Sequence, residues 1–142
     1  MTALFVDTAG WMACADASDA AHDASRAARD NAMRAGRPLV TTDYVVDETL
    51  TLMRIRLGLS ASETWWRQID GSPRVRWERI DSARFDHALE LFFQHRDKGY
   101  SFTDCTSFAV MRELKLASAL TTDKHFKQMG FEVLPSGRAR SR

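Results

Sequence analysis

Four acidic residues that lie far apart in the sequence have surroundings that favour a shared site: Asp7, Glu48, Asp104 and Asp123. Like charges a few ångströms apart repel strongly, so carboxylates gather only where something neutralises them. A hard divalent cation with oxygen ligands does this, and Mg²⁺ is the common choice in proteins. Such a cation can activate water and neutralise phosphate charge, which is the chemistry of phosphodiester hydrolysis.

Two of these acids, Asp7 and Asp123, each follow a predicted strand. The runs at 4–6 and 119–122 have the length and composition of short buried strands. In open parallel sheets, functional sites lie beyond the carboxyl ends of the strands, where both aspartates would stand. A single aspartate there is often a turn residue or a helix cap, and that alternative stays open for each of them.

The neighbouring acids Asp47 and Glu48 differ in their expected surroundings. In a helix over 43–57, a step of about 100° per residue places Asp47 on the polar face and Glu48 on the far side from it. The helix positions around Glu48 are apolar: Tyr44, Val45, Leu52 and Ile55. A carboxylate among apolar side chains is costly unless it is paired or binds a cation. We expect Asp47 to be solvated and Glu48 to face the site, with snorkelling or an arginine partner for Glu48 as the alternative.

Asp104 is expected in the first turn of a helix over 104–116 that Thr103 caps. The positive end of a helix favours a carboxylate at this position, so an ordinary first-turn acid is one interpretation. Phe108 and Met111 lie on the same helix face, four and seven residues further on. Asp104 would therefore point along a buried stripe, which favours an inward-facing role.

Basic residues flank the acidic segments and could hold a phosphate backbone: Arg54, Arg56, Arg112 and Lys124. His125 follows Asp123 by two residues, and either contacts substrate or is a surface or packing residue. The tryptophans at 65, 66 and 77 either stack on bases or pack in the core. Core packing is favoured because the helix that carries two of them has little other apolar material.

The elements that must position these residues alternate along the chain. Strands are expected at 4–6, 39–41, 75–80, 119–122 and 131–134, and helices at about 16–35, 43–57, 60–69, from 81 or 82 onward, and 104–116. Ser60 and Glu63 form a predicted capping box for the third of these helices. This alternation predicts an α/β fold: three layers, α/β/α, with a central, mainly parallel sheet of four to five strands.

Length and composition limit the class of protein. The 142 residues match one domain, which we place at 1–135, followed by a basic tail at 136–142 that we expect to be flexible. The 44% hydrophobic and 27% charged residues exclude an extended disordered chain. No apolar run approaches the roughly 18 residues of a membrane span, and the first residues do not resemble a signal peptide. Cys14 and Cys105 suggest no disulfide framework, so a reducing cytoplasm fits.

Four segments carry a resemblance to a known family: 4–8 (LFVDT), 45–50 (VVDETL), 100–108 (YSFTDCTSF) and 120–126 (LTTDKHF). In order and spacing they are similar to the signature segments of the PIN-domain ribonucleases and, more narrowly, of VapC-type toxins from toxin–antitoxin pairs. The third and fourth segments are the most specific. The resemblance extends from Leu4 to about Leu134, nearly the whole chain.

The resemblance implies a PIN fold and an endoribonuclease that depends on Mg²⁺, with Mn²⁺ as a substitute. By position, Asp7, Glu48, Asp104 and Asp123 would form the catalytic quartet, and Asp7 and Asp104 would be the metal ligands. Thr8 would bind metal-linked water or phosphate. The implied partners are RNA and a small antitoxin protein, and the implied location is the cytoplasm.

The sequence alone leaves three alternatives open. The helices that carry Trp65 and the pair Phe92 and Phe93 present apolar residues that would form a homodimer or an antitoxin surface. A housekeeping PIN nuclease of RNA maturation would share the acids but lack an antitoxin. A non-catalytic α/β domain could bind a cation through the same acids without turnover.

Overall fold

The computed structural model describes residues 2–136. The strands in this part of the chain are β1 (Leu4–Val6), β2 (Leu39–Thr42), β3 (Val75–Glu78), β4 (Ser118–Leu120) and β5 (Glu132–Leu134). The helices are α1 (Thr8–Ala15), α2 (His22–Arg34), α3 (Asp43–Leu57), α4 (Leu59–Asp70), α5 (Ser82–Gln94), α6 (Phe102–Glu113) and α7 (Lys124–Gln128). The predicted basic tail falls almost wholly on residues 137–142, which lie outside the described residues.

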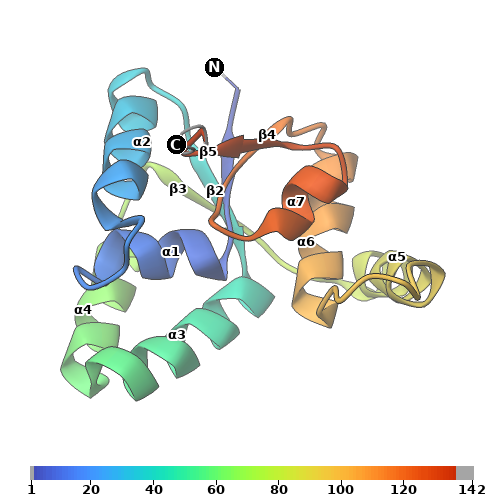
Figure 1. The fold of residues 1–142 in the computed structure, drawn as a ribbon, viewed down its shortest axis with the longest axis horizontal. Coiled ribbons are helices and arrows are strands. Elements are labelled where there is room, and N and C mark those ends of the chain that lie inside the picture. Colours follow the sequence, from blue (N-terminus) through green and yellow to red (C-terminus); the bar gives the residue numbers. More distant parts are fainter. Residues whose placement is uncertain (1, 137–142) are drawn as a thin grey trace.

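The strands form one parallel sheet in the order β3-β2-β1-β4-β5 (Figure 1). β1 is central, and its Phe5 pairs with Val40 on one side and with Ala119 on the other. Helices cover both faces of a parallel sheet, so its central strands read as continuous apolar runs. All three residues of β1 are fully buried accordingly. The predicted α/β class with a mainly parallel sheet is confirmed, at the upper end of the expected strand number.

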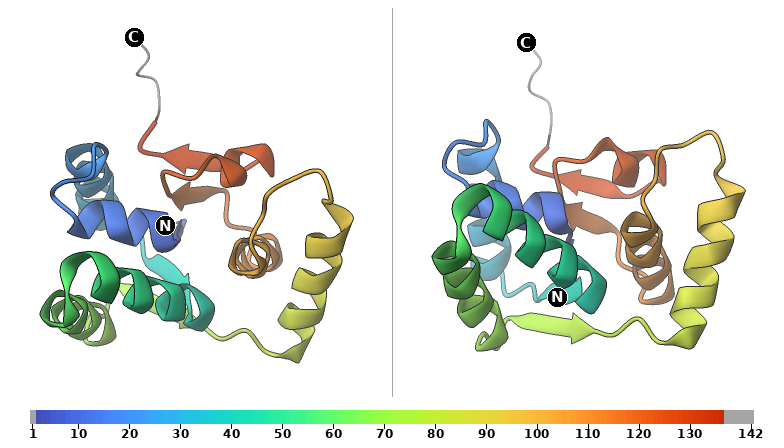
Figure 2. Two further views of the ribbon diagram at one scale, coloured as in Figure 1. Left: turned by 60° about the horizontal axis from the view of Figure 1, so that its bottom comes forward. Right: turned by 90° about the horizontal axis from the view of Figure 1, so that it is seen from below.

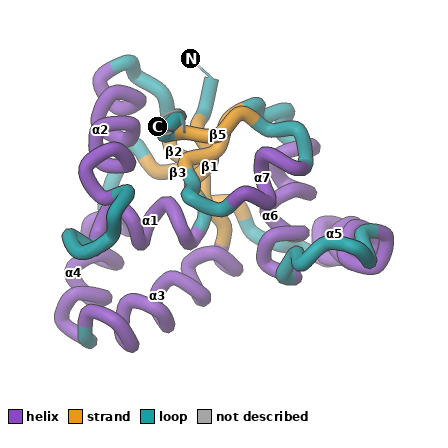
Figure 3. The backbone as a smooth tube through the Cα atoms, in the orientation of Figure 1, coloured by secondary structure: helices purple, strands orange, loops and turns teal. Residues whose placement is uncertain are grey.

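The helices form two groups around the sheet. Helices α1 to α4 gather to one side of the strands, and α5 to α7 lie to the other side (Figures 1 and 2). The tube in Figure 3 shows that the loops after β1 and β4 meet near the starts of α3 and α6. The carboxyl ends of β1 and β4 lie side by side at one edge of the sheet, where the N–H of Asp7 donates a 3.5 Å hydrogen bond to the carbonyl oxygen of Leu120.

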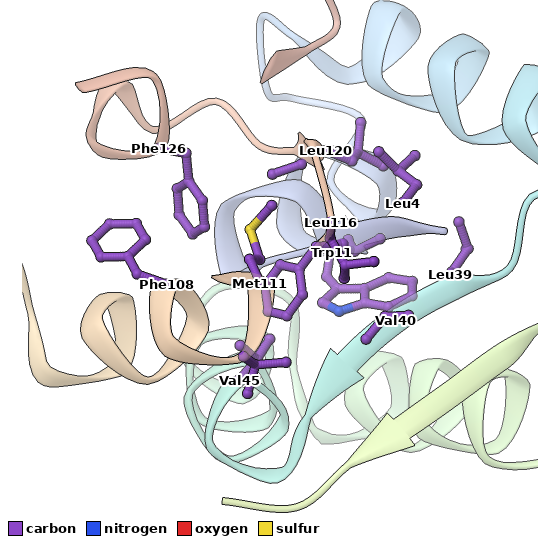
Figure 4. Packing of buried hydrophobic residues seen from close by; sticks show 14 of the residues in the cluster. Leu4, Trp11, Leu39, Val40, Val45, Phe108, Met111, Leu116, Leu120 and Phe126 are labelled. Atoms are coloured by element: carbon purple, nitrogen blue, oxygen red, sulfur yellow. The ribbon is translucent and has the colours of Figure 1, made fainter. Parts of the chain in front are cut away.

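The core is built from both groups of helices packing on the sheet (Figure 4). Phe108 and Met111, which the sequence places on the inner stripe of α6, are fully buried. Trp65 is also buried and meets Trp11 edge-on, with ring centroids 5.6 Å apart. The core interpretation of Trp65 is therefore confirmed, and the base-stacking alternative is wrong for this residue.

The segment after β1 differs from the prediction. The sequence predicts one helix over about 16–35 between the first two strands, but the structure has two helices, α1 and α2. Six of the eight residues of α1 are buried, so this helix carries no amphipathic pattern that a sequence could reveal. Asp16 and Asp19 interrupt the helical structure between α1 and α2. Their carboxylates accept hydrogen bonds from the backbone N–H groups of Ser18 and Ala21, which favours turns there.

Two helix starts also differ from the prediction. α4 begins at Leu59 after Gly58, which has a φ of 101°, so Ser60 lies inside the first turn and forms no capping box. α6 begins at Phe102, two residues earlier than expected, and Ser101 rather than Thr103 is its cap.

The short helix α7 was not predicted, because five residues offer no periodic pattern. The strands β3 and β4 are also shorter than the runs 75–80 and 119–122 suggested. None of the helices in residues 2–136 combines the length and apolar character that a membrane crossing requires.

Candidate active site

Asp7 lies where β1 ends and α1 begins. Its Oδ1 accepts a 2.8 Å hydrogen bond from the N–H of Gly10, which makes Asp7 the N-cap of α1. Gly10 is required here, since a Cβ at this position would stand 2.1 Å from the carbonyl oxygen of Leu120. Asp7 is only 5% exposed, and this burial raises its pKa from 3.8 to about 7 against the lowering effect of its hydrogen bonds. The negative charges of Asp123 and Asp104 raise the pKa of Asp7 further.

Thr121, the residue after β4, connects two of the acids. Its hydroxyl donates a 2.8 Å hydrogen bond to Oδ2 of Asp7. The hydroxyl oxygen of Thr121 also accepts a 2.9 Å hydrogen bond from the N–H of Asp123. Because β1 and β4 are parallel neighbours, their ends bring these residues to one edge of the sheet.

Asp104 approaches the same place from α6. Its Oδ2 accepts a 3.0 Å hydrogen bond from the N–H of Ser101, while Ser101 Oγ accepts one from the N–H of Asp104, so the two residues form a capping box. Burial raises the pKa of Asp104, and the charge of Asp123 adds to this effect. The hydrogen bonds from Ser101 and His125 act in the opposite direction.

His125 lies between two of the carboxylates. Its Nδ1 is 2.9 Å from Oδ2 of Asp104 and 3.1 Å from Oδ1 of Asp123. Asp123 is also the cap of α7, because its Oδ1 accepts a hydrogen bond from the N–H of His125. The three side chains offer ligand atoms that all lie within 4.8 Å of one another, a spacing suited to one metal ion. Asp7 and Glu48 are not part of this close group.

Glu48 reaches the site from α3. It is half-buried, whereas Asp47 is exposed, so the predicted difference between the two neighbours is confirmed. Together the four predicted acids line one cleft of about 350 Å³. The other residues of its wall are Thr8, Ala9, Met12, Asp19, Leu52, Arg56, Gly99, Ser101, Thr122 and His125. A second cavity of about 430 Å³, between α1, α2 and α4, has no carboxylate in its wall.

The described chain matches the PIN domain family over residues 4–132. The chain belongs to the PIN-domain family. It is 36% identical over 135 residues to the 23S rRNA-specific endonuclease VapC20 from Mycobacterium tuberculosis, in strain H37Rv and in strain CDC 1551. The alignment covers 93% of this chain and 98% of either relative.

Solved structures of two other proteins share this fold. The crystal structure of Mycobacterium tuberculosis VapC20, described as a sarcin-ricin loop cleaving toxin, matches with a TM-score of 0.80 and 34% identity, over 91% of this chain and 96% of that one. FitAcB from Neisseria gonorrhoeae matches with a TM-score of 0.65 over 92% of this chain and 95% of that one, and at 15% identity it shows the fold alone. The resemblance drawn from the sequence is confirmed, including the narrower likeness to VapC-type endoribonuclease toxins.

The residues of this PIN domain fit a divalent cation. In its cleft the charges of Asp104 and Asp123 raise the pKa of Asp7, and the charge of Asp123 raises the pKa of Asp104; a cation relieves that repulsion. The buried hydroxyl of Thr8 has no hydrogen-bond partner among residues 2–136, although Thr8 belongs to the cleft wall. A buried polar group without a partner is costly, so this oxygen is suited to a ligand that enters the cleft.

Sequence reasoning missed part of this PIN site. Thr121 and Ser101, which hold Asp7 and Asp104, were not identified as site residues. Both residues lie in segments that carry the family resemblance, 120–126 and 100–108, but the local pattern predicts only a strand at Thr121 and no role for Ser101. Asp19, a further acid in the cleft wall, lies in the segment that was expected to be a continuous helix. A serine three residues before an aspartate is a capping-box pattern, so Ser101 could have been found from the sequence.

Proposed function

We propose that the protein is a Mg²⁺-dependent endoribonuclease that acts in the cytoplasm as the toxin of a toxin–antitoxin pair. The observation that carries the proposal is the convergence of Asp7, Glu48, Asp104 and Asp123, from four separate parts of a PIN fold, on one cleft. Such a cluster has the charge and the oxygen ligands for a cation that assists phosphodiester hydrolysis.

The expected cation ligands are Asp7 and Asp104, with Glu48 and Asp123 completing the site directly or through water. The cation, when bound, would neutralise phosphate charge and lower the pKa of an attacking water. Asp7 is held by Gly10 and Thr121, so its carboxylate needs little reorganisation before it binds. Thr8 would offer its free hydroxyl to a phosphate oxygen or to a bound water molecule.

The remaining residues of the cleft suggest how RNA is held. Five acids line the cleft, and the cations in its wall are Arg56 and, when protonated, His125. Glu48, Leu52 and Arg56 follow one another at intervals of four residues, so they lie along one side of α3. RNA phosphates beyond the cut bond would therefore meet Arg56 along this side of the helix.

Large-subunit ribosomal RNA is the first candidate substrate. The relatives at 36% identity are named for 23S rRNA, and the related crystal structure is that of a toxin that cleaves the sarcin-ricin loop. The alignment with them covers almost the whole of both chains, so the walls of the cleft are included.

The test is brief expression of the intact gene in a bacterial host, followed by sequencing of RNA ends. Wild type should arrest growth and produce new 5′ ends at a defined position in 23S rRNA. The Asp7→Asn variant should do neither, and the Asp47→Asn variant, changed at an exposed acid, should behave as wild type. New ends in other RNAs would refute the ribosomal substrate, and purified protein without metal-dependent cleavage would support the non-catalytic alternative.

The proposed partner is a small antitoxin that places a basic side chain among the four acids, because an arginine or lysine there would compete with the cation. Co-expression of the adjacent small gene should restore growth and yield a complex on purification. Cleavage by the purified enzyme without toxicity or a recovered partner would favour the housekeeping alternative.

We also propose a homodimer through α5. Phe93 is 59% exposed and Phe92 is 37% exposed on this helix, which projects from the body of the protein in Figure 2. Sedimentation should show a dimer for wild type, and a monomer for the Phe93→Ser variant. A monomeric wild type would refute this part of the proposal.

A further inference from the structure

His125 has a fixed position at the edge of the acid cluster. Its backbone N–H donates a hydrogen bond to Oδ1 of Asp123, and its ring packs edge-on against Tyr100 with ring centroids 5.1 Å apart. The side chain is 19% exposed, so the ring has little freedom to leave the carboxylates. Its Nδ1 is therefore held between Asp104 and Asp123, at 2.9 Å and 3.1 Å from their oxygens.

These distances suit a hydrogen bond, and they also suit a metal centre. Neighbouring ligands of an octahedral Mg²⁺-sized ion, with bonds of about 2.1 Å at right angles, stand about 3.0 Å apart. One proton on Nδ1 can serve two carboxylate oxygens only by sharing, whereas one cation can bind all three atoms at once. The three ligand atoms all lie within 4.8 Å of one another, so one cation can reach all of them.

We infer that His125 is a nitrogen ligand, with Asp104 and Asp123, of a divalent cation in this cleft. The group lies on the α6 and α7 side of the cleft and does not contain Asp7. This position therefore differs from a centre held by oxygen ligands of Asp7 and Asp104 alone. The inference rests on the proposed function only in placing the cation in the same cleft.

A nitrogen ligand changes which cation the site prefers. Mg²⁺ favours oxygen ligands, whereas imidazole binds first-row transition ions well, with affinity rising along the series from Mn²⁺. The site should consequently bind Mn²⁺ and Co²⁺ more tightly than Mg²⁺, and His125 should account for part of the difference.

The direct test is pulsed electron paramagnetic resonance of Mn²⁺ bound to the intact protein. Wild type should show a ¹⁴N coupling from a coordinated imidazole, and ¹⁵N labelling of histidine should change that coupling accordingly. The His125→Gln variant should lose it, while His87→Gln, a control on α5 outside the cleft, should keep it. Absence of the coupling in wild type, or its persistence in His125→Gln, would overturn the inference, and the wild-type spectrum does not depend on the folding of any variant.

Calorimetric titration provides the second readout. The His125→Gln variant should bind Mn²⁺ at least about tenfold more weakly than wild type, with a smaller loss for Mg²⁺. Equal losses for the two cations would assign His125 to hydrogen bonding alone. Cleavage of RNA by wild type without nitrogen coupling would refute the ligand and leave the nuclease intact. Nitrogen coupling without RNA cleavage would support His125 as a ligand and refute the proposed nuclease activity.

Discussion

The hydroxyl of Thr121 donates a 2.8 Å hydrogen bond to Oδ2 of Asp7, although the two residues are 114 positions apart in the sequence. This bond joins the ends of β1 and β4 and fixes one of the two oxygens of the Asp7 carboxylate. Gly10 fixes the other oxygen from the first turn of α1. The central acid of the site is thus oriented by the backbone architecture of three elements.

Removal of this bond should weaken cation binding. The Thr121→Val variant keeps the shape of the side chain but leaves Asp7 with one donor fewer, so the pKa of Asp7 should rise further. We expect cation affinity and RNA cleavage to fall about 10–100-fold, the usual effect of losing a partner that orients a ligand. Calorimetry and a cleavage assay measure the two quantities. Thr121→Ser should restore both, and failure of this rescue would mean that the methyl group matters rather than the hydroxyl.

The charge of Asp7 should make the stability of the cation-free protein depend on pH. Its pKa is about 7 in the folded protein and 3.8 as an ordinary value, so the folded state holds the proton more tightly. The stabilisation from this proton is complete below the ordinary pKa and is lost as the pH rises through the folded value. Relative to Asp7→Asn, the free energy of unfolding of wild type should fall by about 2–3 kcal/mol between pH 5 and pH 8.

Urea unfolding in the presence of EDTA measures this difference, and Mg²⁺ should restore stability to wild type but not to the variant. Asp7→Asn should also reduce RNA cleavage at least about 100-fold, since the charge that holds the cation is gone. Parallel stability curves for the two proteins from pH 5 to pH 8 would contradict the assigned environment of Asp7.

The two adjacent acids of α3 should respond differently to loss of charge. Glu48 lies in the cleft wall and Asp47 is exposed on the outside of the helix. Glu48→Gln should reduce cleavage by orders of magnitude, while Asp47→Asn should leave it within about twofold. Single-turnover cleavage of one RNA by both variants makes the comparison. Equal effects of the two changes would contradict the different positions assigned to Glu48 and Asp47 on α3.

The sequence predicted the acids of the site better than it predicted the parts that hold them. Asp7 and Asp123 follow apolar runs, and Glu48 has a clear helical phase, so each carries a local signal. The bond between Thr121 and Asp7 has no such signal, because it depends on the pairing of β1 with β4.

Local sequence patterns also predicted only part of the fold. The strands and the α/β class followed from alternating runs, whereas α1 was missed because it is buried nearly all round. The fit of Gly10 against Leu120 could not be predicted either, since it arises only when α1 packs on the end of β4.

Arg56 should contribute to RNA binding more than the other arginines of α3. It lies on the same side of the helix as Glu48 and belongs to the cleft wall. The helical rise of about 1.5 Å per residue places it about 12 Å beyond Glu48 along the helix axis. Within residues 2–136 it has no carboxylate within ion-pair distance, so its charge is available to a phosphate. Arg54 is two residues away, on another side of the helix and outside the cleft wall, which makes it a matched control.

The Arg56→Gln variant should therefore bind RNA about tenfold more weakly, with little change in the rate of cleavage once RNA is bound. The loss of one phosphate contact should also reduce the slope of log affinity against log salt concentration by about 1. Arg54→Gln should change neither quantity. Fluorescence anisotropy with a short RNA, in the Asp7→Asn background to prevent cleavage, measures affinity at several salt concentrations. If both arginine variants lower the slope equally, the phosphates meet α3 by general attraction, and Arg56 does not define a path for the RNA along the cleft.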